Sequence, residues 1–321
     1  MIKKIFINPI ERRLRSGYRI FLQIIAYFVI MESFYFLIGS PRDMTGKTSL
    51  WIFLAIAGVR LFRGLSSVWL TGRFLDHRPF SEFGIKFNKE WWIDLCFGLG
   101  IGILLMSSIF IIEYFNGWIT ISGTLHTANL GQSFTLSILV FLILFVCVGF
   151  SEELFYRSYL LTNLAEGFNF KVIGPRYSII IAVIFSSFLF GLFHMGNPEA
   201  NLVSTINIIL WGILFSVPFI LTGSLAIPIG IHITWNFFQG NIFGFPISGT
   251  TLPSEAVSVF SIDQGGPEVW TGGYFGPEAG LLGLIACVVG ILLIFGWIHY
   301  RKKSIKLHTK LAQPPFLPTV N

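Results

Sequence analysis

The stretch FTLSILVFLILFVCVGFSEELFYR, residues 134–157, decides the fold, because an apolar run there leads directly into two carboxylates and an arginine. No Asp, Glu, Lys or Arg occurs in 114–151, 177–198, 200–254 or 279–300. A helix of about 20 apolar residues crosses the hydrocarbon core of a bilayer. The chain of 321 residues is 54% hydrophobic and 12% charged, whereas soluble domains have about 25% charged residues. These features exclude an ordinary soluble protein and predict a polytopic membrane protein.

Eight helical spans are predicted from the apolar runs, so the expected fold class is all-α. They cover 19–38, 49–70, 92–112, 134–156, 178–194, 201–221, 225–243 and 280–298. The chain then divides into three N-terminal helices (1–133), a core of helices 4–7 (134–243), a Gly/Pro-rich loop (244–279), and a last helix with a basic tail (280–321). The loop is expected outside the membrane as irregular structure, and the tail after Lys310 is expected to be disordered.

The distribution of basic residues predicts that both termini are cytoplasmic, since Lys and Arg are retained on that side. With the N-terminus inside, 18 of the 22 basic residues lie in inner segments, and only Arg42 and Lys47 lie in outer ones. Arg60 and Arg63, within the second span, are expected to snorkel toward the inner face. The net charge of +6 therefore reflects topology. Nucleic-acid binding is not expected, because no basic patch is interleaved with aromatic residues.

Polar residues inside spans are costly in lipid and mark interior or water-filled sites that carry function. The fourth span ends in an EExxxR pattern at Glu152, Glu153 and Arg157. Glu153 and Arg157 share a helix face, whereas Glu152 points about 100° away from Glu153. The arginine can thus hold one carboxylate while the other stays free. An ion pair at a helix end on the membrane surface is the alternative interpretation.

Two further spans carry histidines. Phe190 and His194 lie on one face at the end of the fifth span, where an interfacial histidine is the alternative. His232 and Asn236 lie one turn apart on the seventh span, and His232 is the only side chain in 200–254 that titrates near neutral pH. A structural hydrogen bond between helices is the alternative for this pair.

Together these groups match the needs of amide hydrolysis. A carboxylate, two imidazoles and an amide supply a base, its partner and two polarising groups. Other intramembrane protease chemistries lack their motifs, since there is no HExxH helix, no GxSG-type serine motif paired with histidine and no pair of span-embedded aspartates. The predicted catalytic residues are therefore Glu152, His194, His232 and Asn236.

These residues can cooperate only at one depth in the membrane. If Glu152 lay at the inner end of span four and His194 at the outer end of span five, they would differ by about 20 Å in depth at 1.5 Å per residue. We therefore expect span four to continue past Arg157 toward Leu164, His194 to turn inward, and the uncharged turn 222–224 to be recessed. Polar backbone at that depth is allowed where it lines a cavity.

The three motifs, EExxxR at 152–157, FxxxH at 190–194 and HxxxN at 232–236, resemble those of the CAAX protease and bacteriocin-processing (CPBP, or Abi) family of intramembrane proteases. The likeness covers about 134–243, with a weaker likeness at 80–86 and at Trp91-Trp92. It implies an eight-helix endopeptidase, similar to the type II CAAX prenyl endopeptidases, with a conical polar cavity at its centre.

The resemblance also implies a role for each motif residue. Glu152 with His194 would activate a water molecule, and His232 with Asn236 would stabilise the oxyanion of the tetrahedral intermediate. The supporting residues would be Glu153, Arg157 and Phe190, with Arg157 either orienting the carboxylates or contacting substrate.

A metal-dependent mechanism is the alternative, because an acid with two histidines can bind zinc. Its ligands would be Glu152, His194 and His232. The metal-free mechanism is favoured, since Asn is a poor zinc ligand and a good oxyanion donor. No other cofactor is expected.

The expected substrate is a hydrophobic or membrane-tethered peptide, of the CAAX-like or bacteriocin-leader type. The expected location is the bacterial cell membrane, with the endoplasmic reticulum as the alternative, and the lipid bilayer is the expected partner. Two other functions stay open: a non-hydrolytic immunity or scaffold protein, and a transporter that uses the buried Glu and His residues as a proton relay. The lack of an internal repeat weakens the transporter interpretation.

Overall fold

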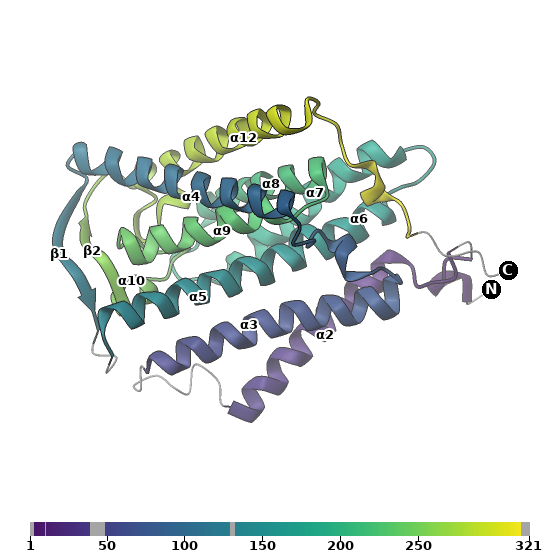
Figure 1. Cartoon of the computed structure of the whole chain (residues 1–321), viewed down its shortest axis with the longest axis horizontal. Coiled ribbons are helices and arrows are strands. Elements are labelled where there is room, and N and C mark those ends of the chain that lie inside the picture. Colours follow the sequence, from purple (N-terminus) through teal and green to yellow (C-terminus); the bar gives the residue numbers. More distant parts are fainter. Residues whose placement is uncertain (1–2, 10, 39–48, 129–131, 316–321) are drawn as a thin grey trace.

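The computed structural model describes residues 3–9, 11–38, 49–128 and 132–315 as a bundle of long helices (Figure 1). The predicted fold class, an all-α polytopic membrane protein, is confirmed. Seven helices in the described residues are long and apolar enough to cross a membrane. They are α2 (Ser16–Ile38), α3 (Leu50–Thr71), α4 (Lys89–Phe115), α5 (Phe134–Glu153) with its continuation, α7 (Gly174–His194), α8 (Leu202–Thr222) and α12 (Leu281–Lys302).

The segment predicted as the seventh span, 225–243, forms a shorter, interior helix. Helix α9 (Ala226–Phe237) has 12 residues and continues as five π-helical residues, η4 (Phe238–Ile242). Every residue of α9 except Asn236 is buried, and the helix contacts α4, α5 and α8. A helix that is apolar on all faces can be either a buried core helix or a membrane span. Hydropathy alone therefore could not predict that protein, rather than lipid, surrounds α9.

Glycines bring the backbones of α4 and α9 into direct contact. A Cβ added at Gly98 would overlap the carbonyl oxygen of Ile227, and one added at Gly230 would overlap the backbone of α4. Next to them, the Thr234 hydroxyl donates a hydrogen bond to the Leu99 carbonyl at 2.9 Å. This contact fixes the position of α9, which carries His232 and Asn236.

We predict that Gly98→Ala destabilises the protein by about 1–3 kcal/mol, because the added methyl group must push α9 away from α4. Gly100→Ala is the matched control, since nothing lies within 4 Å of its added Cβ on the same helix. That change should be neutral or stabilising by up to about 1 kcal/mol. Thermal unfolding in detergent measures both variants, and equal stability of the two would contradict the close packing of α4 and α9.

Span four is one continuous helical segment that passes through the EExxxR motif. α5 is followed without a break by the π-helical η3 (Leu154–Leu160) and by α6 (Leu161–Gly167), so the whole segment runs from Phe134 to Gly167. This confirms the expectation that the span continues past Arg157. π-helical turns inside α-helices are frequent at functional sites, and this one begins directly after Glu153.

A two-stranded sheet covers one end of the bundle, and the sequence did not predict it. β1 (Ile119–Thr127) pairs antiparallel with β2 (Val257–Gln264), at the end of the helices opposite to both termini (Figure 1). The expectation that 244–279 is irregular is therefore wrong for β2 and for the short helices of this loop, namely α10 (Leu252–Ala256), α11 (Glu268–Thr271), η5 (Gly273–Phe275) and η6 (Pro277–Ala279). The strands are distant in sequence, so no local pattern marks their pairing.

The C-terminal tail packs on the helices instead of being disordered. The 3₁₀ turn η7 (Thr309–Ala312) buries Leu311 and Ala312, and the side chain of Asn169 donates a hydrogen bond to the Ala312 carbonyl at 2.7 Å. The backbone N–H of His308 donates a hydrogen bond to the Ile220 carbonyl at 2.7 Å, which places the tail beside the turn at Gly223. The prediction of disorder is thus wrong for 311–315, and the remainder, 316–321, lies outside the described residues.

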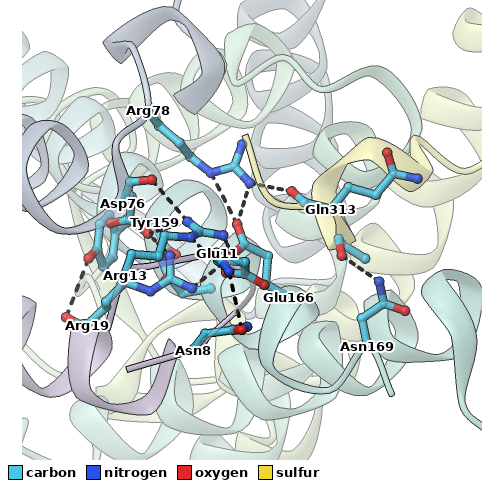
Figure 2. A network of polar contacts seen from close by, with 12 residues as sticks. Asn8, Glu11, Arg13, Arg19, Asp76, Arg78, Tyr159, Glu166, Asn169 and Gln313 are labelled. Atoms are coloured by element: carbon cyan, nitrogen blue, oxygen red, sulfur yellow. Dashed lines mark hydrogen bonds and ion pairs between the residues drawn. The ribbon is translucent and has the colours of Figure 1, made fainter. Parts of the chain in front are cut away.

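A buried network of charges joins both terminal segments to the bundle (Figure 2). Its centre is Glu166 on α6, which accepts hydrogen bonds from Arg13, Arg19 and Arg78. The side chains of Glu166 and Arg19 are only 5% and 2% exposed. Arg19 also pairs with Asp76 in η1 (Gly72–Asp76), and Arg78 donates to the carbonyl of Gln313 in the tail. The remaining short helices at this end are α1 (Lys3–Phe6) and η2 (Phe80–Phe83).

We predict that Glu166→Ala costs about 3–5 kcal/mol of stability, because removing one partner leaves buried charges uncompensated. Glu90→Ala is the matched control, because the Glu90 side chain is 65% exposed and pairs with Arg301 at the surface. This change should lower the free energy of unfolding by no more than about 1 kcal/mol. Thermal unfolding of the two variants is the measurement. If Glu166→Ala unfolds at the same temperature as Glu90→Ala, the network does not hold the termini.

Candidate active site

A cavity of about 910 Å³ lies inside the bundle, between α2, α3, α5, α7, α8, α9 and the 244–279 loop. The four predicted catalytic residues all line it: Glu152 from α5, His194 from the end of α7, and His232 and Asn236 from α9. The structure therefore brings residues from three separate helices to the wall of one cavity. The roles assigned to these residues stay predictions.

His232 lies between the two adjacent carboxylates of the EExxxR motif. Its Nδ1 is 2.7 Å from Oε1 of Glu153, and its Nε2 is 3.9 Å from Oε2 of Glu152. A carboxylate accepts a hydrogen bond, so Nδ1–H is the donor to Glu153. This bond fixes the orientation of the ring and turns Nε2 toward Glu152 and the cavity.

Glu153 is fully buried and has a second partner in Arg157. Arg157 Nε is 3.3 Å from Glu153 Oε2, as the spacing of four residues predicts. The guanidinium also lies 4.0 Å from the ring centre of Phe190 and 5.1 Å from that of Phe215. Arg157 is only 1% exposed, so it holds Glu153 from behind. Of the two predicted roles for Arg157, the geometry favours orientation of the carboxylates.

Phe215 is a site residue that the sequence analysis missed. Its ring stacks on His232, with ring centres 5.1 Å apart and planes 17° apart, and it also contacts Arg157. Phe215 lies in an uncharged span among many other aromatic residues, so no spacing signal distinguishes it. Its stacking confines the imidazole from the side that the carboxylates leave open.

His194 is oriented by the backbone of its own helix. Its Nδ1 lies 2.8 Å from the carbonyl oxygen of Phe190, which can only accept, so Nδ1 carries the proton and Nε2 is left for the cavity. The Phe190 ring packs against the imidazole, with centres 4.5 Å apart. Among the described residues His194 forms no ion pair with Glu152, although both side chains line the cavity.

Arg60 and Arg63 both line the cavity, and the expectation that they snorkel toward the inner face stays a prediction. Arg60 Nη1 lies 3.8 Å from Oε1 of Glu152. The Arg63 guanidinium lies 4.4 Å from the centre of the Tyr27 ring.

The geometry does not match the predicted zinc site. Within the part of the chain that the structure describes, no group of three His, Cys, Asp or Glu side chains is arranged to hold a metal ion. Tetrahedral zinc sites need at least three protein ligands at about 2.0–2.3 Å. The zinc alternative stays a prediction, and no step of the mechanism below depends on it.

Residues of the 244–279 loop line part of the cavity, and one of them is a buried carboxylate. Glu278 lines the cavity and is 3% exposed. It accepts hydrogen bonds from the Ser248 backbone at 2.9 Å, from the Ser248 hydroxyl at 2.8 Å, and from Gln239. Burial raises the pKa of the Glu278 carboxyl, although these hydrogen bonds oppose the rise.

We predict that Glu278 makes stability depend on pH. Because its pKa in the folded protein is raised, its contribution is fully present below the ordinary value of 4.5 and is lost as the pH rises through the folded-state pKa. Glu278→Gln keeps the shape of the side chain but removes the titrating carboxyl group. The unfolding temperature of this variant should therefore fall less from pH 4.5 upward than that of the unmodified chain. Glu268→Gln, on the exposed surface of the same loop, is the control. Parallel pH curves for Glu278→Gln and the unmodified chain would refute the assignment.

Comparison with known proteins identifies the segment that carries this site. Residues 134–238 match the family described as type II CAAX prenyl endopeptidase Rce1-like. This segment is Rce1-like. The resemblance inferred from the three motifs is thereby confirmed. The Rce1-like segment contains Glu152, His194, His232 and Asn236, whereas α2 and α3 lie outside it.

One curated relative extends the similarity beyond that segment. The uncharacterized protein YyaK of Bacillus subtilis (strain 168) is 27% identical over 249 residues, which cover 75% of this chain and 73% of YyaK. No solved structure matches the chain. At the level of the family, the Rce1-like match supports a CAAX-type protease, and the seven apolar helices support an integral membrane protein.

Proposed function

We propose that this protein is an intramembrane endopeptidase that hydrolyses a peptide bond in a hydrophobic or membrane-tethered peptide. The observation that carries the proposal is the meeting of Glu152 and His232, from α5 and α9, 3.9 Å apart in a cavity that His194 and Asn236 also line. The Rce1-like match over 134–238 supports the same reaction class.

Glu152 is the general base in this proposal. A water molecule between Glu152 and the free Nε2 of His194 gives a proton to the carboxylate as its oxygen attacks the scissile carbonyl carbon. His194 suits this position, because its Nδ1–H is committed to the Phe190 carbonyl and only Nε2 faces the cavity. The proton held by Glu152 then passes to the leaving amine, so that one water is consumed and two peptides are released.

His232 and Asn236 stabilise the oxyanion of the tetrahedral intermediate. Nδ1 of His232 donates to Glu153, so Nε2 can donate to an oxyanion only when the ring is protonated. Glu152 and Glu153 lie one on each side of the ring. Asn236, one turn along α9, supplies an amide N–H that needs no change of charge. Each such donor contributes about 10²- to 10³-fold to the rate.

The walls of the cavity suit an apolar substrate. Aromatic side chains from several helices surround the polar groups, including Phe53, Phe141, Phe145, Phe155 and Trp211. The proposed substrates are CAAX-like or bacteriocin-leader peptides, and the proposed location is the bacterial cell membrane with both termini in the cytoplasm. The termini lie at the same end of the helices, which agrees with this orientation (Figure 1).

We predict that Glu152→Gln and His194→Ala each lower peptide cleavage by about 10²- to 10⁴-fold, because each removes part of the proton-transfer machinery. The assay uses the full-length protein in lipid vesicles with a panel of lipidated and bacteriocin-leader peptides. Glu268→Gln and His299→Ala, both exposed and outside the cavity, are matched controls that should keep full activity. Cleavage that is unchanged in both Glu152→Gln and His194→Ala would contradict the protease proposal and favour the non-hydrolytic scaffold.

A further inference from the structure

Segments that are distant in sequence meet around the turn between α8 and α9, remote from the groups of the proposed mechanism. The backbone N–H of Leu225 donates a hydrogen bond to the Gly84 carbonyl at 3.0 Å, a few residues before α4 begins. On the other side of the turn, His308 of the tail donates from its backbone to Ile220, and its ring lies against Gly223. The start of α4 and the tail therefore lie on two sides of one turn.

The end of α12 joins the same surface. Arg301 pairs with Glu90, and the indole N–H of Trp297 donates a hydrogen bond to Asp94 at 2.9 Å. The Phe97 ring stacks on Trp297, with ring centres 4.1 Å apart. α12 ends, and the tail begins, at the end of the bundle that carries both termini (Figure 1). We call the surface formed by 84–94, 297–303 and 304–315 the basic surface.

The lysines of the basic surface have no acidic partner. Among the described residues none of them forms an ion pair, since both carboxylates of these segments, Glu90 and Asp94, lie against Arg301. No Asp or Glu occurs in 279–321. Six lysines of the basic surface are exposed, namely Lys86, Lys89, Lys302, Lys303, Lys306 and Lys310.

These charges lie close enough to act on one group. Burial lowers the pKa of the His308 imidazole, and the positive charges of Lys86, Lys302 and Lys310 lower it further. The three lysines come one from each segment of the basic surface. Like charges that are held together destabilise the compact state by repulsion. The basic surface therefore suits a partner that brings several negative charges.

Exposed aromatic side chains indicate where this partner lies. Phe87, Trp92 and Tyr300 are 55%, 50% and 67% exposed, and Lys303 Nζ lies 5.2 Å from the centre of the Tyr300 ring. Trp and Tyr are enriched at the level of the lipid headgroups. α4 begins and α12 ends at this surface, and both are long and apolar enough to cross a membrane. Lysine clusters next to the end of a span attract anionic lipids.

We propose that the basic surface binds the headgroups of anionic phospholipids in the adjoining membrane leaflet. The ammonium groups stay hydrated on flexible stems, which suits a fluid layer of phosphates better than a fixed bidentate site would. The aromatic residues and the span ends beside the lysines favour lipid over an acidic protein as the partner. This proposal does not depend on the hydrolytic activity.

The test titrates the full-length protein in detergent with phosphatidylglycerol and with phosphatidylcholine of the same acyl chains. Native mass spectrometry counts the bound lipids. Phosphatidylglycerol should bind about tenfold more tightly or better, because several lysines contribute to one contact. This preference should shrink as salt is added, since exposed charges are screened. A ratio of affinities near one for the unmodified chain would overturn the proposal and favour an acidic protein partner.

A variant with four lysines of the basic surface replaced should bring the ratio close to one; its changes are Lys86→Gln, Lys302→Gln, Lys306→Gln and Lys310→Gln. The same four positions changed to Arg should keep the ratio, because the charge is retained. All four side chains are exposed, so both variants should unfold at the temperature of the unmodified chain.

The matched control removes four exposed basic residues that lie outside the basic surface, through Arg12→Gln, Arg73→Gln, Lys171→Gln and Arg176→Gln. It lowers the net charge by the same amount and should keep most of the preference. A preference that survives loss of the four lysines, or one that falls equally in the control, overturns the assignment to the basic surface.

Discussion

The contact of one imidazole with two neighbouring carboxylates is the constraint on which the rest of the site depends. His232 bonds to Glu153 through Nδ1 and faces Glu152 through Nε2. Because the bilayer offers no water to solvate stray charges, these groups must satisfy one another inside the protein. The pairing thereby fixes α9 against α5 and defines which carboxylate remains available to the cavity.

The surrounding structure serves to hold that contact in place. Glycine contacts seat α9 directly on α4, the continuous segment from Phe134 to Gly167 carries the EExxxR motif past mid-span, and Arg157 supports Glu153 from behind. The charge network around Glu166 joins both terminal segments, and the loop with Glu278 lines part of the cavity. Helices α4, α5 and α9 therefore hold the polar side chains of the site in place, and Arg60 and Arg63 of α3 line the same cavity.

Most of the spans and the polar site could be predicted from signals within single segments. Contacts between segments that are distant in sequence could not be predicted. The apolar runs, the Glu153–Arg157 spacing and the continuation past Arg157 are properties of single segments, and the structure agrees with each. The pairing of β1 with β2, the docking of Leu311 in the tail and the burial of α9 depend on partners distant in sequence. The approach of Arg60 to Glu152 was not predicted for the same reason, since only the folded bundle brings these two side chains together.

The most direct test of the account joins Glu152 and His232 physically in the native membrane. All three natural cysteines are free thiols, so they can be replaced, and Glu152→Cys can be combined with His232→Cys. A short bifunctional maleimide should then cross-link the full-length chain within itself. The pairing of Glu152→Cys with Ile184→Cys, on an exposed face of α7, should give no cross-link. Failure of the first pair to react, or equal reaction of both, would contradict a shared cavity for these two helices.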